Sequence, residues 1–411
     1  MSLRTDANEI IQTAIRDALP DSAVRTALET ADISGELYLV AVGKAAWQMA
    51  KTAVEVLGNR IKAGIVITKH GYSGGAIEGL RIFEAGHPVP DADSYRATQA
   101  VMDLTAPLGK GDRVLFLLSG GGSALFEKPQ IAGDELADIT KQLLASGADI
   151  VEMNTIRKRL SFVKGGRFAQ LCAPAKVYAI VLSDIVGDPL DMIASGPAYP
   201  DSSTCEQALS IAKRYRLRLS ERAAALLREE TPKALSNVET VITGSVRALC
   251  KGAAEAAQAL GYRPVILTDS LGCEARDAGS FLASVARYYA ASEGSLAFLA
   301  GGETVVHLTG KGLGGRNQEI ALSAAAGIDG LRGVAVFSVG SDGTDGPTDA
   351  AGGFADGETA QKLREQGISI ADALRNNDAY HALAACGGLI VTGPTGTNVN
   401  DVALVLIRRD A

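Results

Sequence analysis

The sequence predicts an α/β protein of two domains, and three observations support this prediction. The chain has 411 residues, which is more than one ordinary hydrophobic core holds. It combines 46 glycines with 47% hydrophobic and only 5% aromatic residues, a composition that suits strands and helices joined by tight glycine turns. Continuous apolar runs end repeatedly in glycine and are followed by helical periodicity, which is typical of strands buried on both faces of a sheet.

Charge and cysteine usage exclude several classes of protein. Forty basic residues against 47 acidic ones give a net charge of −7, and without a long basic run nothing suggests nucleic-acid binding. The five cysteines are scattered and form no CxxC pair, which argues against zinc fingers and disulfide frameworks. The N-terminus carries acids where a signal peptide is apolar, and no apolar run approaches the ~20 residues of a membrane span. A soluble cytoplasmic protein without a membrane partner is expected.

Residues 1–235 read as the first domain. Helical spacing predicts two helices within residues 7–31, which could pack on either domain. The segment Glu229-Glu230-Thr231-Pro232 is the best candidate for the boundary. Repeated strand–helix units precede it, with strands expected at Leu37–Val42, Gly64–Thr68, Arg81–Glu84, Arg113–Leu118 and Val177–Leu182.

Residues 236–411 read as a second, mixed α/β domain. A hairpin across Gly301-Gly302 is expected to join two adjacent apolar runs, Leu296–Ala300 and Thr304–Leu308. The other strands are expected at Thr240–Thr243, Pro264–Thr268, Val334–Val339, Gly388–Val391 and Val402–Ile407.

Glycine-rich or charged loops follow these predicted strands, at the edge where open α/β sheets bind ligands. Lys44 follows the first strand, and Ser119-Gly120-Gly121-Gly122-Ser123 follows the fourth. Three successive glycines let backbone N–H groups converge on an anion, although a solvated lysine and a plain tight turn remain alternatives. Asp184 and Asp188 follow the fifth strand, and such carboxylates suit Mg²⁺.

A basic segment lies between these loops. Five cations occur within residues 157–167, among apolar side chains. They read either as a solvated helix face or as an anion site, which the Lys164–Arg167 sequence Lys-Gly-Gly-Arg favours.

Two loops of the second half gather further charge. Gly310–Glu319 (GKGLGGRNQE) holds four glycines with Lys311 and Arg316, and Ser341–Asp349 (SDGTDGPTD) holds Asp342 and Asp345. Cations, amides and carboxylates on glycine-permitted backbone indicate a site for a phosphorylated ligand and a divalent metal.

The motifs of other chemistries are absent. The chain has no HExxH, no Walker A motif and no GxGxxG after the first strand. Phosphoryl transfer needs little covalent help from the protein, but it does need cations, a metal and positioning. The residues at the predicted strand ends fit that demand.

Eight motifs in order resemble the class II glycerate kinases, the glycerate 2-kinase family whose C-terminal module is called MOFRL. The matching segments cover nearly the whole chain: VAVGKAA (41–47), AGHPVPD (85–91), LSGGGSAL (118–125), NTIRKRLSFVKGGR (154–167), SDIVGDPLDMIASGP (183–197), GGETVVHLTGKGLGGRNQE (301–319), GSDGTDGPTDAAGG (340–353) and TGPTGTNVND (392–401).

The resemblance implies a Rossmann-like N-terminal domain with a parallel sheet, a mixed-sheet MOFRL-type C-terminal domain, and an active site in the cleft between them. It implies transfer of the γ-phosphate of ATP to D-glycerate with Mg²⁺, giving 2-phosphoglycerate in glyoxylate, tartrate or serine-type carbon metabolism. A homodimer is one assembly to expect.

The resemblance also implies residue roles. Lys44, Arg316 and Asp184 are the expected catalytic residues. Substrate or phosphate would be bound by Ser119, Gly120, Gly121, Gly122, Ser123, Asn154, Arg157, Lys164 and Asp188. The nucleotide would be bound by Gly244, Ser245, Gly302, Glu303, Lys311, Gly314, Gly315 and Asn317. The metal would be held among Asp184, Asp188, Asp342 and Asp345.

Two other functions stay open at this point. Members of the family are often labelled hydroxypyruvate reductase, an NAD(P)H-dependent activity, but the chain lacks a dinucleotide fingerprint. A non-catalytic sensor of sugar acids or nucleotides would use the same fold, and the density of charge at the strand ends argues against it.

Overall fold

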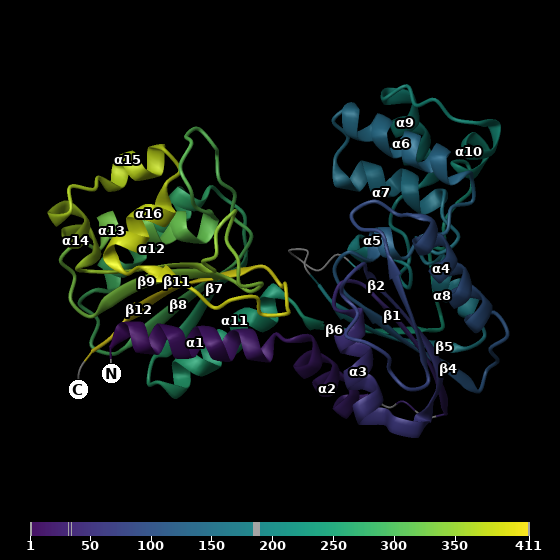
Figure 1. Cartoon of the computed structure of the whole chain (residues 1–411), viewed down its shortest axis with the longest axis horizontal. Helices are drawn as coiled ribbons and strands as arrows, with labels where there is room; N and C mark the ends of the chain where they lie inside the picture. Colours follow the sequence, from purple (N-terminus) through teal and green to yellow (C-terminus); the bar gives the residue numbers. More distant parts are fainter. Residues whose placement is uncertain (1, 32, 34, 184–189, 410–411) are drawn as a thin grey trace. The chain divides into compact units, whose positions relative to one another are not determined.

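The computed structural model describes residues 2–31, 33, 35–183 and 190–409 (Figure 1). It divides into two compact units, each built on a six-stranded sheet. Residues 23–183 and 190–243 form the N-terminal unit, and residues 2–22 and 244–409 form the C-terminal unit. Two α/β domains, as the sequence predicts, are therefore confirmed.

The sheet of the N-terminal unit has the strand order β3-β2-β1-β4-β5-β6. β1 pairs in parallel with β2 and β4, and the β2–β3 and β4–β5 pairs are parallel as well. This is the order of doubly wound dinucleotide-binding folds, in which the direction of winding reverses between β1 and β4. The strands are β1 (Glu36–Val42), β2 (Ile61–Lys69), β3 (Leu80–Ala85), β4 (Asp112–Leu118), β5 (Lys176–Leu182) and β6 (Val238–Gly244).

Helices cover both faces of this sheet. On one face, the fully buried Met49 and Ala53 of α3 pack against Leu39 of β1 and Leu115 of β4. A separate small core joins α6, α7, α9 and α10 above the sheet. The helices of this unit are α2 (Pro20–Thr30, which begins in the other unit), α3 (Ala46–Leu57), α4 (Ala92–Thr105), α5 (Gly122–Leu125), α6 (Gly133–Ala145), α7 (Ile150–Arg159), α8 (Arg167–Cys172), α9 (Cys205–Arg214) and α10 (Glu221–Leu226), with 3₁₀ turns at Gly58–Arg60 and Ile193–Ser195.

The sheet of the C-terminal unit is mixed, as predicted. Its order is β11-β10-β9-β12-β8-β7; β7 and β8 are parallel and the other pairs are antiparallel. The strands are β7 (Arg263–Leu271), β8 (Leu296–Gly302), β9 (Val334–Gly340), β10 (Gly352–Asp356), β11 (Leu389–Ile390) and β12 (Asp401–Ile407).

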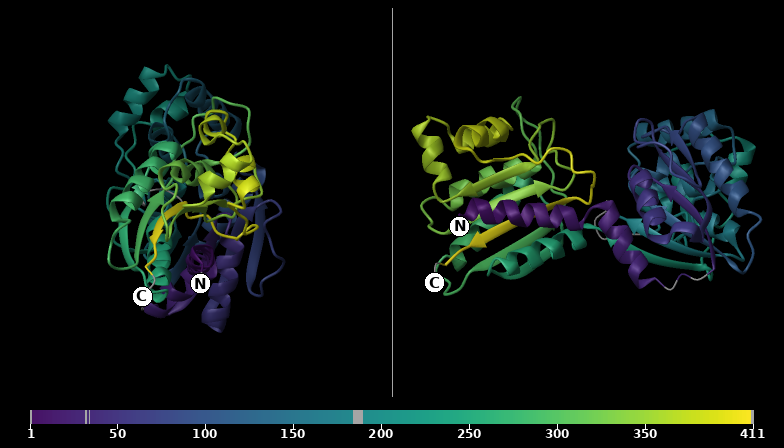
Figure 2. Two further views of the ribbon diagram at one scale, coloured as in Figure 1. Left: turned by 90° about the vertical axis from the view of Figure 1, so that its left-hand side faces the viewer. Right: turned by 60° about the horizontal axis from the view of Figure 1, so that its bottom comes forward.

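The N-terminal helix belongs to the C-terminal unit. Ile10 and Ile11 of α1 pack with Leu249 of α11 and Leu404 of β12 in one core on one face of the sheet. Figure 2 shows α1 lying along this sheet, with α12 and α13 on the opposite face. The helices of the unit are α1 (Leu3–Asp17), α11 (Val246–Ala259), α12 (Ala275–Tyr289), α13 (Arg316–Gly327), α14 (Thr359–Glu365), α15 (Ile370–Arg375) and α16 (Ala379–Cys386). None of the described helices is long and apolar enough to cross a membrane.

Two sequence predictions about strands are wrong. The predicted hairpin does not form: β8 ends at Gly302, and the following segment makes only one bridge, between Val305 and Glu274. The apolar side chains of Val305 and Leu308 remain exposed, so this apolar run does not form a buried strand. The strand predicted at Thr240–Thr243 as part of the second domain is β6, which extends the first sheet beside β5.

A buried carboxylate ties α1 to the rest of the C-terminal unit. Asp6 is 1% exposed, and its Oδ2 atom accepts hydrogen bonds from Tyr262 Oη at 2.5 Å and from the Arg408 guanidinium at 2.7 Å. Removing one partner from a buried pair leaves the other charge uncompensated.

We therefore expect Asp6→Ala to lower the free energy of unfolding of the C-terminal unit by about 3 kcal/mol. Glu9→Ala, an exposed position on the same helix, is the matched control and should change stability by less than about 0.5 kcal/mol. Urea unfolding of both variants measures the difference. Equal midpoints for the two variants would show that Asp6 does not anchor the helix.

Candidate functional site

The loops that follow β1 and β4 meet at the point where the first sheet reverses its winding. Lys44 N donates to Gly120 O at 2.9 Å, Ala45 N donates to Ser119 Oγ at 3.1 Å, and Ser119 N donates to Val42 O at 2.9 Å. In open α/β sheets, ligands bind in the crevice at this reversal. The structure thus brings together Lys44 and the serine–glycine loop, which the sequence predicts as parts of one site.

The close contact between these two loops requires glycine at position 43. Gly43 has φ of +128°, and a Cβ atom there would lie 2.1 Å from Ser119 Oγ and 2.5 Å from Ser119 O. A side chain would therefore push the two loops apart. The sequence Gly-Lys after β1 reflects close packing of two loops rather than a Walker A motif.

The two loops present unused hydrogen-bond donors. Within the described part of the chain, the backbone N–H groups of Gly120, Gly121, Gly122 and Ser123 donate to no backbone carbonyl. The Lys44 ammonium likewise has no hydrogen bond or ion pair to a described residue, and its side chain is half-buried. Convergent free amides beside a free ammonium form a binding site for an anion.

Two cations, Lys164 and Arg157, donate hydrogen bonds to the end of this loop. Lys164 is fully buried, and its Nζ atom donates to Ser123 O at 2.8 Å and to Phe126 O at 3.1 Å. Arg157 also donates to Ser123 O, at 3.0 Å. Both cations face the buried Glu127 carboxylate, at 3.5 Å from Lys164 and 3.7 Å from Arg157. Burial lowers the pKa of Lys164 to about 8.

Asn154 belongs to the same support. Its Oδ1 atom accepts a hydrogen bond from Ser195 Oγ at 2.9 Å, and the Ser195 hydroxyl lies 3.0 Å from Ser123 Oγ. Of the predicted substrate-binding residues, Arg157 and Lys164 therefore bond the loop directly, and Asn154 reaches it through Ser195.

The basic segment is not a solvated helix face, so that interpretation is wrong. Lys158 and Arg159 are at most 1% exposed and lie beside the buried Asp201 carboxylate, at 3.0 Å and 3.8 Å. Arg167 donates to the carbonyl oxygens of Arg159 and Ser161. Helical spacing among apolar residues is compatible with exposure of these cations. The acid that pairs with them, Asp201, lies about 40 residues further along the chain, so the local sequence does not reveal it.

In the C-terminal unit, Arg316 is fixed by two carboxylates. Its Nε and Nη2 atoms donate to Asp401 at 2.5 Å and 3.1 Å, and Nη1 donates to Glu303 at 3.0 Å. Burial alone would lower the pKa of Arg316, but the hydrogen bonds and charges of these acids raise it. Three of the five guanidinium N–H groups bond these carboxylates, and the other two bond no described residue.

Asp345 caps the helix that carries Arg316. Its two oxygens accept hydrogen bonds from the backbone N–H groups of Asn317 at 3.2 Å and Gln318 at 2.9 Å. The side chain is nearly buried, and burial raises the pKa of Asp345 to about 6. Asp342, on the same loop, is half-buried and accepts from Thr344 N through one oxygen.

The remaining predicted residues of this unit fall into three places. Gly302 ends β8 next to Glu303, and Gly315 precedes α13 against the Asp345 carboxyl, so these residues gather around Arg316. Lys311 N donates to Asn376 Oδ1 in a separate loop, with Gly314 packed beside Ala379. Gly244 ends β6 and Ser245 caps α11 through Ala248 N. Asp184 and Asp188 lie outside the described residues.

Several site residues escaped the sequence reasoning. Glu127 and Ser195 support the loop, and Asp401 orients Arg316 from 85 positions away along the chain. The signal available for Asp401 was the motif TGPTGTNVND, which ends with it and directly precedes an apolar run.

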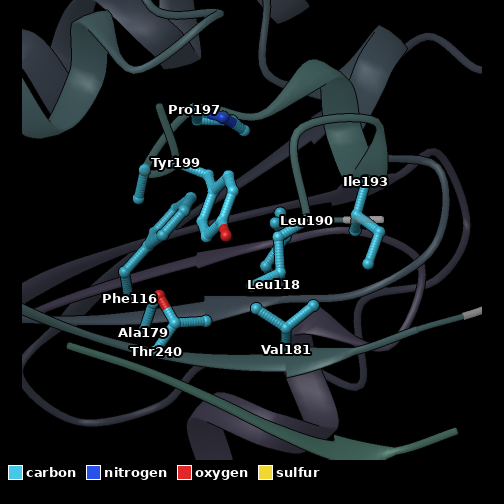
Figure 3. A pocket seen from close by; sticks show the side chains of 10 residues that line it. Phe116, Leu118, Ala179, Val181, Leu190, Ile193, Pro197, Tyr199 and Thr240 are labelled. Atoms are coloured by element: carbon cyan, nitrogen blue, oxygen red, sulfur yellow. The ribbon is translucent and has the colours of Figure 1, made fainter. Parts of the chain in front are cut away.

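An apolar pocket beside the loop is not a ligand site. Phe116, Ala179 and Val181 of the sheet face Leu190 and Tyr199 of the following segment (Figure 3). The cavity measures about 10 Å³, which is the room that one water needs. It reflects packing of residues 190–199 onto the sheet.

Comparison with known proteins matches both halves of the chain. Residues 6–228 match the model of a domain of unknown function, DUF4147, and residues 296–401 match the MOFRL family. The D-glycerate 2-kinase of Thermotoga maritima is 51% identical over 99% of both chains. The glycerate 2-kinase of Pyrococcus horikoshii is 39% identical over 99% of this chain and 98% of its own. The chain belongs to the glycerate 2-kinase family.

Solved structures of the glycerate 2-kinase family agree with this. The crystal structure of glycerate kinase from Thermotoga maritima superposes with a TM-score of 0.95, covering 99% of each chain at 51% identity. The structure of a Pyrococcus horikoshii protein also gives 0.95, covering 100% of this chain and 99% of its own at 38% identity. A family member from Agrobacterium vitis, 42% identical over 91% of this chain and all of its own, carries a provisional hydroxypyruvate reductase name.

Removing Lys164 should destabilise the fold, because the buried Glu127 carboxylate would lose a neighbouring cation. We expect Lys164→Met to lower the free energy of unfolding by about 3 kcal/mol, because Glu127 is buried with neither oxygen hydrogen-bonded. The double variant Lys164→Met/Glu127→Gln should recover part of this loss. Denaturant titration of both variants tests the pair, and a double variant less stable than the single one would contradict it.

The raised pKa of Asp345 predicts a pH dependence of stability. Between about pH 4 and pH 6 the folded state holds this proton and the unfolded state does not, so stability falls as the pH rises through this window. The full contribution is about 3 kcal/mol. Asp345→Asn should remove this part of the profile in unfolding titrations without divalent metal, whereas Asp342→Asn should retain it.

Proposed function

We propose that the protein is an ATP- and Mg²⁺-dependent D-glycerate kinase that forms 2-phosphoglycerate. The observation that carries the proposal is the Lys44 ammonium, which pairs with no described residue, beside four amides that donate to no described backbone carbonyl at the reversal point of the first sheet. Relatives named glycerate kinases, from Thermotoga maritima to Danio rerio, each match 99% of this chain. An anion site of this kind fits both a carboxylate and a phosphoryl group.

In this proposal, Lys44 and the amides of residues 120–123 stabilise negative charge on the substrate. Phosphoryl transfer spreads charge over the oxygens of the moving group, so fixed donors lower the barrier by electrostatics and positioning. The buried Lys164 and the partly buried Arg157 both donate to the Ser123 carbonyl, which fixes the end of the loop within the N-terminal unit.

Arg316 contributes a second, preorganised cation. Asp401 and Glu303 fix its plane, and the two N–H groups that bond no described residue suit phosphate or carboxylate oxygens. Because its orientation is set within the C-terminal unit, binding an anion costs little side-chain entropy.

The carboxylates of the C-terminal unit differ in their fitness for Mg²⁺. Asp345 has both oxygens engaged by backbone N–H groups, whereas Asp342 uses only one, so Asp342 is our candidate ligand among the described residues. When bound, Mg²⁺ neutralises charge on the nucleotide phosphates, and it takes few protein carboxylates because it keeps waters. Asp184 and Asp188 stay predictions for the same role.

The strand order of the first sheet also occurs in NAD(P)-binding proteins, so the reductase alternative needs a direct test. The turn after β1 offers no glycine fingerprint, and Ser119 closes it tightly. ATP-dependent turnover of D-glycerate, with enolase distinguishing 2- from 3-phosphoglycerate, supports the kinase. NADH consumption with hydroxypyruvate in the absence of ATP would refute it.

Lys44→Met and Arg316→Met should each lower kcat by about 10³-fold or more, because each removes a cation from the developing charge. Lys51→Met and Arg364→Met are matched controls on exposed helix surfaces, and they should keep activity within about twofold. Steady-state kinetics with ATP, Mg²⁺ and D-glycerate measure all four. Near-normal turnover of either site variant removes that residue from the catalytic set.

A further inference from the structure

His87 lies at the anion site without an established role. It follows β3 in the segment Gly86–Pro90, and its ring faces the glycine loop. A Cβ atom built on Gly121 would lie 3.1 Å from His87 Cδ2, 3.3 Å from His87 Nε2 and 3.2 Å from Lys44 Cγ. The imidazole edge and the lysine stem therefore converge on the loop whose amides are free.

Both ring nitrogens of His87 are available. Neither makes a hydrogen bond or ion pair to any residue that the structure describes. Two other histidines are committed to carboxylates: His70 lies 2.9 Å from Asp91, and His381 lies 2.6 Å from Asp378. His87 is also only partly exposed, so its position is set by packing rather than by solvent.

The surroundings of His87 keep its imidazole neutral. Burial lowers the pKa of His87 below its ordinary value of 6.5, and the charges of Lys44 after β1 and Lys69 at the end of β2 lower it further. The acid nearest along its own loop, Asp91, is occupied by His70 and by the first turn of α4. A neutral imidazole can accept a proton at physiological pH.

We propose that His87 is the general base of the reaction, accepting through Nε2 the proton of the glycerate hydroxyl. This rests on the proposed glycerate kinase function. The hydroxyl oxygen forms a bond to the γ-phosphorus of ATP, and the bond from that phosphorus to the β–γ bridging oxygen breaks. The hydroxyl proton moves to His87, ADP leaves with the bridging electron pair, and His87 then releases the proton to water.

The test compares His87→Gln and His87→Ala with wild type over pH 5–9. We expect kcat to fall about 10²-fold in both variants, with the KM for glycerate changed by less than about threefold. In wild type, kcat/KM should fall as the pH drops through the pKa of His87, below about 6.5. This acid limb should disappear in both variants, and added imidazole should restore part of the turnover of His87→Ala.

His381→Gln is the matched control and should keep the wild-type rate and pH profile. Thermal unfolding and calorimetric binding of D-glycerate separate a folding defect from a chemical one, and His87→Asn replaces any variant that fails to fold. An unchanged acid limb in His87→Gln, or a rise in KM alone, overturns the proposal and leaves a carboxylate such as Asp184 as the base. Wild type without kinase activity refutes the proposed function itself, and the role of His87 with it.

Discussion

The candidate site of the N-terminal unit depends on a cation that solvent does not reach. Lys164 holds the carbonyl oxygens of Ser123 and Phe126, and the fully buried Phe126 ring packs edge-on against Phe168 at 5.2 Å. These bonds fix the end of the loop and the start of the segment that follows it, so the position of the loop depends on an ammonium buried beside Glu127. Donors fixed in advance are what electrostatic stabilisation of an anion requires.

Much of the fold could be predicted because local pattern and buried environment agree. The run Leu37–Val42 is apolar throughout, and β1 is indeed buried between two neighbouring strands. Prediction failed for strands whose place depends on pairing with segments distant in the sequence. No strand is predicted from the sequence at β10, which begins with Gly352 and Gly353, and a Cβ at Gly352 would lie 2.0 Å from Ser338 O of the adjacent strand. β6 lies beside β5 at the edge of the first sheet, and its own sequence does not indicate to which sheet it belongs.

For the candidate site, the sequence predicts which residues are present better than it predicts which groups they contact. Glycine and charge at strand ends located Lys44 and Arg316, because sheet topology dictates where ligands bind. Whether a charged side chain serves a ligand or another side chain depends on groups distant in sequence. Asp401 orients Arg316, and α13 begins where Asp345 accepts its first N–H groups. Lys164 and Asp345, to which the resemblance gives substrate and metal roles, bond backbone groups in the structure, and their roles toward a ligand stay predictions.

Helix α1 packs in the core of the C-terminal unit, most of which is synthesised after residue 243. Ile10 and Ile11 pack against Leu249 and Leu404, so the apolar face of α1 has no native partner until about 240 further residues have been translated. At typical synthesis rates this interval lasts about 10–50 s, far longer than local helix formation. During that time α1 is an exposed amphipathic segment on the ribosome, which is the kind of surface that chaperones bind. The N-terminal unit, whose residues are nearly contiguous, can fold meanwhile.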